Sequence, residues 1–521
     1  AITARIADGE YPAIVVAVVD GDRSHVYTFG KLGNGKAPDA DTMFQIGSVT
    51  KTFTATLLAE AVDQDNLKLD TPVAKLLPTY KLWPRDGKQI TLGELATQYS
   101  GLPRLPGNLD PAADPQDPYA DYDAAKLKAF LAGYVLPRDP GSAYEYSNLG
   151  FGLLGDALAQ QAGMSYAALL QKKILQPLGM SSTRATLSEP LTGHWAMGHD
   201  EFGKPAEPWH FGVLAGAGAI NSTGADMLRY LEANMGDCTS TLQRAMQLAH
   251  QPRRVMNKNE GVGLAWVTGH GSESNVVWHN GMTGGYASFI GFTTDGRHGV
   301  VILTNIAQSV DDLGFAIMLP DTPLAPAEKT IAMSPQQLDA YPGQYQIASK
   351  FMLHIFREHD QLYAQATGQG AFPIFPTAKD AFFAKITDIR IDFHRGKDGK
   401  VESLMIHQSG HIMLAPKLDT TIIEKPAGHH AIHLDTATLQ QYIGRYQLSP
   451  NVVLNVTFDK GQLMAQLTGQ PSFPIYPSAR DEFFLTVVDA QLSFKRDPQG
   501  KVSAVVLHQN GTNQLAKRIG W

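Results

Sequence analysis

The sequence has 521 residues, more than one ordinary domain, and its 43% hydrophobic content is that of a globular protein able to build several cores. A net charge of −7, with no cluster of basic and aromatic residues, argues against a nucleic-acid-binding surface. No apolar run approaches the roughly 18 residues of a membrane-spanning helix.

The cysteine count and the first residue further limit the classes of protein to which this chain can belong. The single cysteine, Cys238, excludes an internal disulfide framework, and no C-x-x-C pair is present to hold zinc. Nothing near Cys238 would lower the pKa of its thiol, so we expect no nucleophilic role for it. The chain begins with Ala1, which fits an exported and processed protein as well as a trimmed chain.

The first elements are a predicted hairpin and a helix. The apolar run 14–19, a turn at 20–22 and the alternating segment 24–29 predict two paired strands. The segment 44–55 predicts the opening of a buried helix that carries Ser48 and Lys51, three positions apart and so on one helical face. A lysine amine that burial keeps neutral can take the proton of a serine hydroxyl. The alternative is a capped helix start with a solvated lysine.

A second polar group precedes another predicted helix. Segment 91–99 predicts a helix, and the Pro-, Gly- and Asp-rich stretch 103–118 predicts a long surface loop. A Pro-Gly turn at 140–141 then leads to Tyr146 and Asn148, before the apolar helix predicted for 149–162. A phenol and an amide on one side of a loop can hold a proton and a carbonyl together. Alternatively, Asn148 is only the helix cap.

The next stretch contains the third candidate group. The alternating Ala and Gly residues of 212–221 predict close backbone packing before a helix at 223–234. His279 ends an apolar strand and is followed closely by Gly281, and two more strands are predicted at 287–292 and 299–305. The alternative for His279 is a buried ring bonded to a backbone carbonyl.

Taken together, Ser48-x-x-Lys51, Tyr146-x-Asn148 and His279-x-Gly281 resemble the three-motif signature of penicillin-recognising serine hydrolases. That group comprises class C β-lactamases, DD-carboxypeptidases, D-aminopeptidases and related esterases. The order and spread of the motifs match, and the flanking segments 69–72, 99–103 and 177–180 are also similar. The resemblance implies an α+β fold for residues 1–320, an antiparallel sheet covered by helices, with the site between sheet and helical lobe.

The same resemblance implies roles for the motif residues. Ser48 attacks the carbonyl carbon, while Lys51 and Tyr146 share the general-base work, with the first base left open. Asn148 orients the substrate amide, and the backbone N–H groups of Ser48 and Met282 form the oxyanion hole. Neither a metal nor another cofactor is expected. The remaining implied substrate contacts come from the third motif and its flank: Asn280, Gly281 and Thr283.

The identity of residue 279 affects which substrates the site can anchor. The family's usual lysine at this position carries a charge that anchors a carboxylate, whereas histidine is largely neutral near pH 7. We therefore expect a hydrolase of D-amino-acid-containing peptides or amides, located in the periplasm or outside a bacterial cell. Carboxylesterase and weak β-lactamase activity are the alternatives, with β-lactams as candidate acylating ligands. The non-enzyme alternative is a penicillin-binding sensor of peptidoglycan.

The rest of the chain is a duplication. Segments 341–345 and 372–376 recur at 442–446 and 473–477, both 101 residues later and without a gap. Their short alternating segments predict two all-β antiparallel barrels, which resemble the lipocalin-like barrels appended to some D-aminopeptidases. They serve either as structural or oligomerising modules or as a source of a loop that narrows the pocket. The expected boundaries are a linker at 321–335, a barrel at 336–418, a second linker at 419–438 and a second barrel at 439–521.

Other histidines carry less information. His429 and His433 lie four apart between the repeats, but we expect an exposed linker there and no metal site. His194, His199 and His210 surround a loop that can face the site, and their roles are left open.

Overall fold

The computed structural model describes two compact units, residues 1–132 with 136–418 and residues 133–135 with 419–521. Cys238 and the pair His429 and His433 lie outside the described residues. None of the described helices is long and apolar enough to cross a membrane. The description covers residues 2–520 except 8, 110–113, 115, 188–193, 238, 271–272, 320–321, 323, 325–328, 349–350, 368–370, 387–388, 409–410, 419–433, 450–451, 460–461, 468–471, 486–489, 498 and 510–511.

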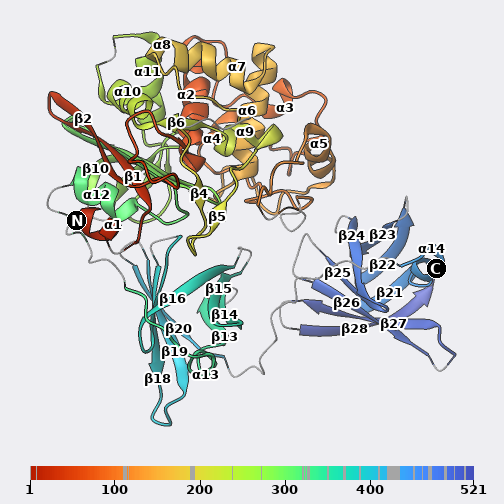
Figure 1. Ribbon diagram of the computed structural model, residues 1–521. Coiled ribbons are helices and arrows are strands. Elements are labelled where there is room, and N and C mark those ends of the chain that lie inside the picture. Colours follow the sequence, from red (N-terminus) through yellow and green to blue (C-terminus); the bar gives the residue numbers. More distant parts are fainter. Residues whose placement is uncertain are drawn as a thin grey trace. The chain divides into compact units, whose positions relative to one another are not determined.

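An eight-stranded sheet organises the first unit, and its main strands pair antiparallel (Figure 1). The predicted hairpin lies at one edge. The strand that carries His279 pairs with the first of the two strands predicted after it, and that strand pairs with the second. From edge to edge the order is β2 (Arg23–Gly30), β1 (Ala13–Asp20), β12 (His298–Thr304), β11 (Ala287–Thr293), β10 (Glu273–Met282), β9 (Val267–His270), β8 (Gly261–Val262) and β7 (Arg254–Val255).

Helices cover both faces of this sheet. Ile14 and Val16 of β1 belong to a core that includes residues of α1 (Ile2–Ala7) and α12 (Asp311–Met318). Val15, between them, points to the other face, where a Cβ at Gly224 of α10 (Gly224–Met235) would lie only 2.5 Å from its side chain. Successive side chains of a strand point to opposite faces. Burial on both faces therefore explains why this strand is an uninterrupted apolar run.

The helical lobe is built around α2 (Thr50–Asp63), which contacts α6 (Asn148–Ala162), α9 (Ala215–Gly218) and α11 (Thr241–His250) (Figure 1). The predicted close packing of the Ala-Gly run is observed, since a Cβ at Gly155 would lie 2.9 Å from the Cα of Gly216. The shorter elements of this unit are α3 (Val73–Leu76), α4 (Leu92–Ala96), α5 (Ala124–Gly133), α7 (Tyr166–Leu170), α8 (Gln176–Leu178) and the strand pairs β3 (Met43–Gln45) with β6 (Asn221–Thr223) and β4 (Gly198–His199) with β5 (Pro205–Ala206).

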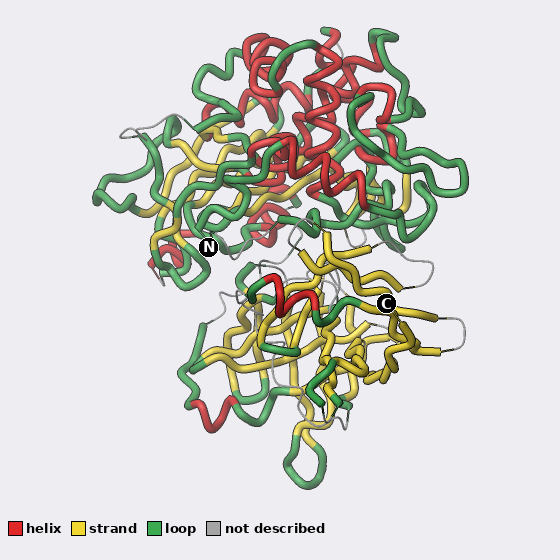
Figure 2. Tube along the Cα trace, turned by 90° about the vertical axis from the view of Figure 1, so that its right-hand side faces the viewer, coloured by secondary structure: helices red, strands yellow, loops and turns green. Residues whose placement is uncertain are grey.

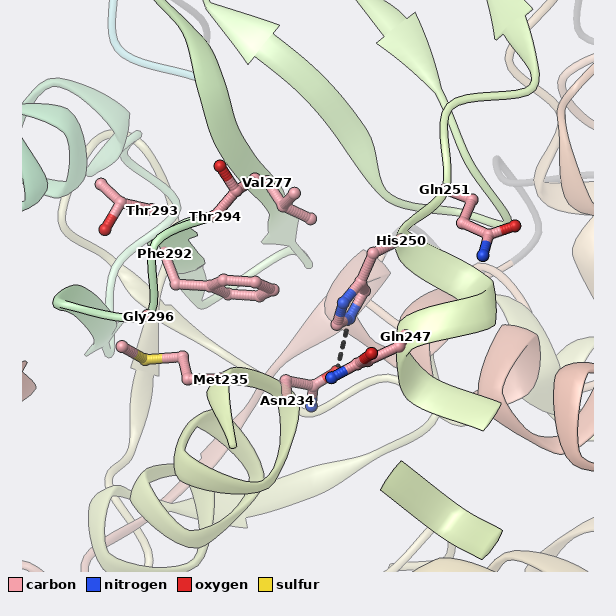
Figure 3. A pocket seen from close by; sticks show the side chains of 10 residues that line it. All are labelled: Asn234, Met235, Gln247, His250, Gln251, Val277, Phe292, Thr293, Thr294 and Gly296. Carbon is pink, nitrogen blue, oxygen red and sulfur yellow. Dashed lines mark hydrogen bonds between the residues drawn. The ribbon is translucent and has the colours of Figure 1, made fainter. Parts of the chain in front are cut away.

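A cavity of about 310 Å³ lies between α10, α11 and the strands β10 and β11 (Figure 3). One wall is His250, whose Nε2 lies 2.8 Å from the side-chain oxygen of Asn234. Burial lowers the pKa of His250 to about 3, so this ring is neutral at physiological pH. Neither Ser48 nor Lys51 lines this cavity.

The two repeats each form an eight-stranded antiparallel barrel, so the predicted fold class is confirmed for both parts of the chain (Figure 2). The second barrel is closed by pairing of its first and last strands, whereas the first closes through an isolated bridge between Tyr345 and Lys417. The first comprises β13 (Gly343–Ala348), β14 (Phe351–Glu358), β15 (Gln361–Ala366), β16 (Phe372–Ala378), β17 (Ala381–Ala384), β18 (Ile389–Arg395), β19 (Val401–Gln408) and β20 (His411–Pro416). The second comprises β21 (Gly444–Ser449), β22 (Val452–Asp459), β23 (Gln462–Leu467), β24 (Ser472–Ala479), β25 (Glu482–Leu485), β26 (Ala490–Arg496), β27 (Val502–Gln509) and β28 (Thr512–Gly520), and the short helices α13 (Pro335–Leu338) and α14 (Thr436–Gln440) precede the two barrels.

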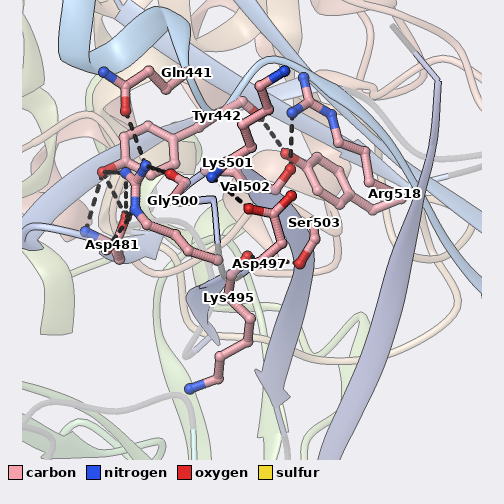
Figure 4. Close-up of polar contacts among 12 residues, drawn as sticks. Gln441, Tyr442, Asp481, Lys495, Asp497, Gly500, Lys501, Val502, Ser503 and Arg518 are labelled. Carbon is pink, nitrogen blue, oxygen red and sulfur yellow. Dashed lines mark hydrogen bonds and ion pairs between the residues drawn. The ribbon is translucent and has the colours of Figure 1, made fainter.

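The same polar cluster recurs in both barrels. The hydroxyl of Tyr341 donates to Asp380 at 2.9 Å, and Arg395 donates to the same carboxylate at 2.7 to 3.0 Å. In the second barrel, the Tyr442 hydroxyl donates to Asp481 with the same 2.9 Å distance (Figure 4). The duplication seen in the sequence is therefore repeated in side-chain geometry as well as in strand order.

The first barrel also touches the turn between β4 and β5 within the first unit. Lys385 Nζ donates to the backbone oxygen of Glu201 at 3.2 Å, and the rings of Phe202 and Phe375 pack with their centroids 5.7 Å apart. Residues 201 and 202 belong to the turn between β4 and β5, whose Gly198 packs against Gly285 near the third motif. These contacts involve the support of the third motif and not Ser48 itself.

We predict that Asp380→Asn lowers the stability of the first barrel by about 1 kcal/mol, because a charge-assisted hydrogen-bond pair at a partly exposed site is lost. Hydrogen bonding to Arg395 lowers the pKa of Asp380. The stability that the Asp380 carboxylate contributes is therefore present above about pH 3.9, the pKa of an unfolded aspartate. It is lost as the pH falls through the lower pKa of Asp380 in the folded protein. Calorimetric unfolding at pH 7 and at about pH 3 should show a difference from wild type that shrinks in acid. Asp398→Asn, at an exposed carboxylate, is the control.

Candidate active site

Ser48 lies in a single 3-10 turn, Gly47–Val49, that leads directly into α2. The sequence predicted it in the opening turn of the helix itself, and the structure places it one turn earlier. Gly47 has a φ of +49°, a left-handed conformation that glycine adopts without strain. Lys51 then falls in the first turn of α2, and its Nζ lies 2.9 Å from Ser48 Oγ.

Lys51 is fully buried, with 0% of its surface exposed, so the alternative of a solvated lysine is wrong. Its Nζ donates to the backbone oxygen of Ala217 at 2.7 Å and lies 5.0 Å from the centre of the Tyr146 ring. Burial lowers the pKa of Lys51, because the ammonium form loses hydration inside the protein. The amine can therefore be unprotonated next to the serine hydroxyl.

Tyr146 completes a group of three side chains with Ser48 and Lys51. Burial alone would raise the pKa of this phenol, but the charges of Lys51 and Arg104 and hydrogen bonding to Ser48 and Lys51 lower it. A phenol whose ionised form is favoured in this way can exchange a proton with either neighbour. The group has the composition of a nucleophile with two candidate bases.

Ser147, and not Asn148, caps helix α6. The Ser147 hydroxyl accepts from the backbone N–H of Gly150 at 2.8 Å, which satisfies one of the unpaired donors of the first turn. The alternative of Asn148 as the cap is therefore wrong. The backbone N–H of Asn148 donates to the carbonyl of Arg104 at 2.9 Å, so the loop that follows the 99–103 segment holds this residue in place.

Two buried polar atoms of the predicted site residues have no hydrogen-bond partner within the described part of the chain. They are Asn148 Oδ1 and Thr283 Oγ1. A buried polar atom without a partner is costly, and native proteins keep such atoms mainly where a ligand or water completes them. One accepts and the other can donate as well as accept, which suits an amide group of a substrate.

The predicted oxyanion-hole segments approach each other closely. A Cβ at Gly47 would lie 2.6 Å from Met282 N, and a Cβ at Gly281 would lie 3.0 Å from Ser48 N and 2.1 Å from the oxygen of Ile46. Only glycine fits at both positions. The end of β10 and the Ser48 turn are thereby in backbone contact, which brings the N–H groups of Ser48 and Met282 into one small region.

His279 is buried beside this group, and burial together with the charge of Lys51 lowers its pKa to about 3. Its Nδ1 lies 2.6 Å from the backbone oxygen of Asn280. Because a carbonyl only accepts, Nδ1 carries the ring proton and the ring is neutral at pH 7. The side chain of Asn280 is exposed and donates to Asp311 at 2.6 Å, so the structure does not bring it to the catalytic group.

Sequence reasoning missed the aromatic cluster of Tyr119, Trp209 and Phe211. Tyr119 stacks on Phe211 with ring centres 4.9 Å apart and interacts with the side chain of Asn148. Trp209 lies so close to Gly284 that a Cβ there would be 2.6 Å from its indole nitrogen. The cluster thus joins the second motif to the third. The available signal was the presence of aromatic residues in two otherwise polar loops.

The histidines left open have structural contacts. His199 Nδ1 lies 3.0 Å from the backbone oxygen of Asn305, and His210 Nδ1 lies 2.5 Å from Asp117. His194 and Asp39 are both exposed and lie 4.0 Å apart. Within the described residues no group of three or more His, Cys, Asp or Glu side chains could hold a metal ion.

Residues 1–319 match the beta-lactamase family, and residues 327–423 and 429–517 each match a domain of unknown function, DUF3471. The chain is 28% identical over 328 residues to the D-alanyl-D-alanine-carboxypeptidase/endopeptidase AmpH of Escherichia coli strain K12, covering 58% of this chain and 83% of that protein. It is 24% identical over 442 residues to penicillin-binding protein 4* of Bacillus subtilis strain 168, covering 77% of this chain and 94% of that protein.

A solved structure extends the comparison. The D-alanine carboxypeptidase AmpC from Burkholderia cenocepacia superposes with a TM-score of 0.51 at 25% identity, covering 61% of this chain and 95% of that one.

We predict that Lys51→Arg lowers kcat by about 10² to 10⁴-fold, because a guanidinium cannot lose the proton that a general base must exchange. In the wild type, the acidic limb of the pH profile of kcat/KM should have its midpoint below 10.5, the ordinary lysine value, since burial lowers the pKa of Lys51. Steady-state kinetics from pH 5 to about 10 measure both effects. A fully active arginine variant would contradict this assignment.

A second prediction concerns the backbone contact. Gly281→Ala places a methyl group 2.1 Å from the oxygen of Ile46, so the end of β10 must move away from the Ser48 turn. We expect kcat to fall about 10² to 10³-fold, the usual cost of losing one oxyanion donor. Gly33→Ala, at a position with open space around it, is the matched control and should keep full activity.

Proposed function

Because this chain belongs to the beta-lactamase family and is a serine hydrolase, we propose that it cleaves amide or peptide bonds in D-amino-acid-containing peptides or amides through an acyl-enzyme. The observation that carries the proposal is the fully buried Lys51 amine 2.9 Å from the hydroxyl of Ser48. A buried amine at this distance can accept the hydroxyl proton as the oxygen attacks.

The proposed reaction has two halves. Ser48 Oγ bonds to the carbonyl carbon while its proton passes to Lys51 or Tyr146, and the carbonyl oxygen becomes an oxyanion beside the N–H groups of Ser48 and Met282. The proton then goes to the leaving nitrogen, the C–N bond breaks, and an ester to Ser48 remains. Water attacks that ester, gives its proton to the same base and releases the acid, while the Ser48 hydroxyl is restored. Oxyanion donors of this kind supply about 3 kcal/mol of stabilisation each.

The substrate class is supported by the names of similar proteins and by the third motif. Two of these proteins are a D-alanyl-D-alanine-carboxypeptidase/endopeptidase and a D-alanine carboxypeptidase. The neutral ring of His279 supplies no positive charge for the carboxylate of a β-lactam. The same neutrality favours carboxylesterase activity as the second candidate, because an ester without a carboxylate needs no anchor. AmpH of Escherichia coli and penicillin-binding protein 4* of Bacillus subtilis are both bacterial proteins, and we propose a periplasmic or secreted location for this chain.

Substrate profiling of the wild type beside Ser48→Ala tests the proposal. We expect turnover of D-alanyl peptides or D-amino-acid amides by the wild type and a loss of at least about 10³-fold in the variant. Turnover of nitrophenyl esters alone would favour the esterase. Incubation with a fluorescent penicillin is the second arm. A stable adduct on Ser48 with no turnover of any substrate would contradict the proposed hydrolase and favour a penicillin-binding sensor.

A further inference from the structure

We propose that Arg104 is the carboxylate-binding residue of this active site, which extends the proposed function to substrates that carry a free carboxylate near the scissile bond. The proposal rests on that proposed function for the nature of the reaction. The evidence specific to this proposal is that the Arg104 guanidinium lies beside Tyr146, is exposed and has no carboxylate partner among the described residues.

Arg104 stands at the catalytic tyrosine. Its guanidinium carbon lies 5.1 Å from the centre of the Tyr146 ring, on the scale of a cation–π contact. Its charge also acts on Tyr119 and Tyr144, so the side chain lies among three tyrosines of the site. Stacking of this kind limits the freedom of a long side chain, which reduces the entropy lost on binding a ligand.

The backbone of Arg104 is fixed while its side chain is exposed. Its carbonyl accepts from the backbone N–H groups of Asn148 at 2.9 Å and Leu149 at 3.2 Å. Arg104 is exposed although it belongs to this tightly bonded loop. The side chain therefore projects from a rigid support next to Asn148, whose Oδ1 is one of the unpartnered buried atoms.

No carboxylate of the described residues pairs with the Arg104 guanidinium, and no hydrogen bond from it occurs there. Arg138, by contrast, contacts the carboxylate of Glu145. In a chain with a net charge of −7, an unpaired arginine beside the nucleophile favours an anionic ligand. The planar fork of a guanidinium matches a carboxylate with two parallel hydrogen bonds.

The other basic groups of the site cannot take this role. Lys51 is fully buried and already bonded to Ser48 and Ala217. His279 is neutral, and its Nδ1 is used by the carbonyl of Asn280. The charge that the third motif does not supply is therefore present beside Tyr146, on a residue of the loop that supports the second motif.

A matched substrate pair tests the proposal. The pair is N-acetyl-D-alanyl thioglycolate, which carries a carboxylate, and its methyl ester, which does not. On the plateau of the pH profile, Arg104→Gln should lower kcat/KM for the acid about tenfold, mainly through KM, and lower kcat/KM for the ester much less. Arg104→Lys, which keeps the charge without the fork, should lose less. Arg254→Gln is the control, since Arg254 is exposed and stacks on Tyr99 at 5.3 Å in the same manner.

The pH dependence of kcat/KM provides a second test, because a general loss of folded protein would lower kcat/KM without shifting the midpoint of its acidic limb. Without the charge of Arg104, the pKa of Tyr146 rises, so the acidic limb of kcat/KM for the ester should shift to higher pH in Arg104→Gln. Equal losses for the acid and the ester, or no loss for either, would overturn the proposal.

A binding measurement separates this proposal from the proposed function. Calorimetry with N-acetyl-D-alanyl-glycine, whose carboxylate lies beyond the scissile bond as in the thioglycolate, and with its C-terminal amide compares Ser48→Ala with the double variant that also carries Arg104→Gln. We expect about tenfold weaker binding of the acid to the double variant and equal binding of the amide. If the wild type turned over neither thioester, the proposed function would fail, and this comparison would still decide the role of Arg104. Equal binding of the acid to both proteins would refute it.

Discussion

The burial of one amine against one hydroxyl is the constraint on which the rest of this structure depends. Lys51 has no exposed surface, and it is held by Ser48 Oγ and by the carbonyl of Ala217. Removing an ammonium from water is expensive unless the group becomes neutral. The helical lobe imposes this cost through close packing of α6 and α9 around α2, where glycines replace side chains that would not fit. The packing of the lobe and the reactivity of the serine thus have one physical origin.

The sheet contributes the third motif to the site, and here too two backbone segments lie so close together that only glycine fits between them. Gly281 at the end of β10 lies against the backbone of Ile46 and Ser48, at a distance that no side chain allows. The strand is kept in place by its partner β11 and by helices on both faces of the sheet. The β4–β5 turn supports the residues after the third motif and also contacts the first barrel. The barrel therefore reaches the site through backbone supports and not through a catalytic group.

The electrostatics of the site are arranged around Tyr146. Lys51 lies 5.0 Å and Arg104 5.1 Å from the centre of its ring, and the phenolate is favoured by the charge of Arg104 and by that of Lys51 when Lys51 is protonated. His279, in contrast, contributes a neutral ring at the position where the resemblance implies a lysine in related enzymes. Arg104, in the loop that supports the second motif, stays charged at every accessible pH. It therefore places a positive charge elsewhere in the site than a lysine in the third motif would.

Local patterns in the sequence indicated most of the elements and the candidate site residues. Apolar runs indicated the strands of the sheet, the i and i+3 spacing placed Ser48 near Lys51, and an ungapped repeat indicated two barrels. These features follow from interactions between neighbours along the chain, so spacing alone reveals them. Asn280 shows the limit, since alternation along β10 turns it away from His279 and towards Asp311.

Only the tertiary structure decided which groups meet and in which ionisation state. The choice of Ser147 over Asn148 as the cap depends on the loop that holds both residues. The low pKa of His279 depends on its burial among residues distant in sequence. Arg104 lies in the loop that the sequence indicated as a surface segment, and the cluster of Tyr119, Trp209 and Phe211 joins residues from two loops. Desolvation and contact between distant segments are properties of the folded chain, and no local pattern encodes them.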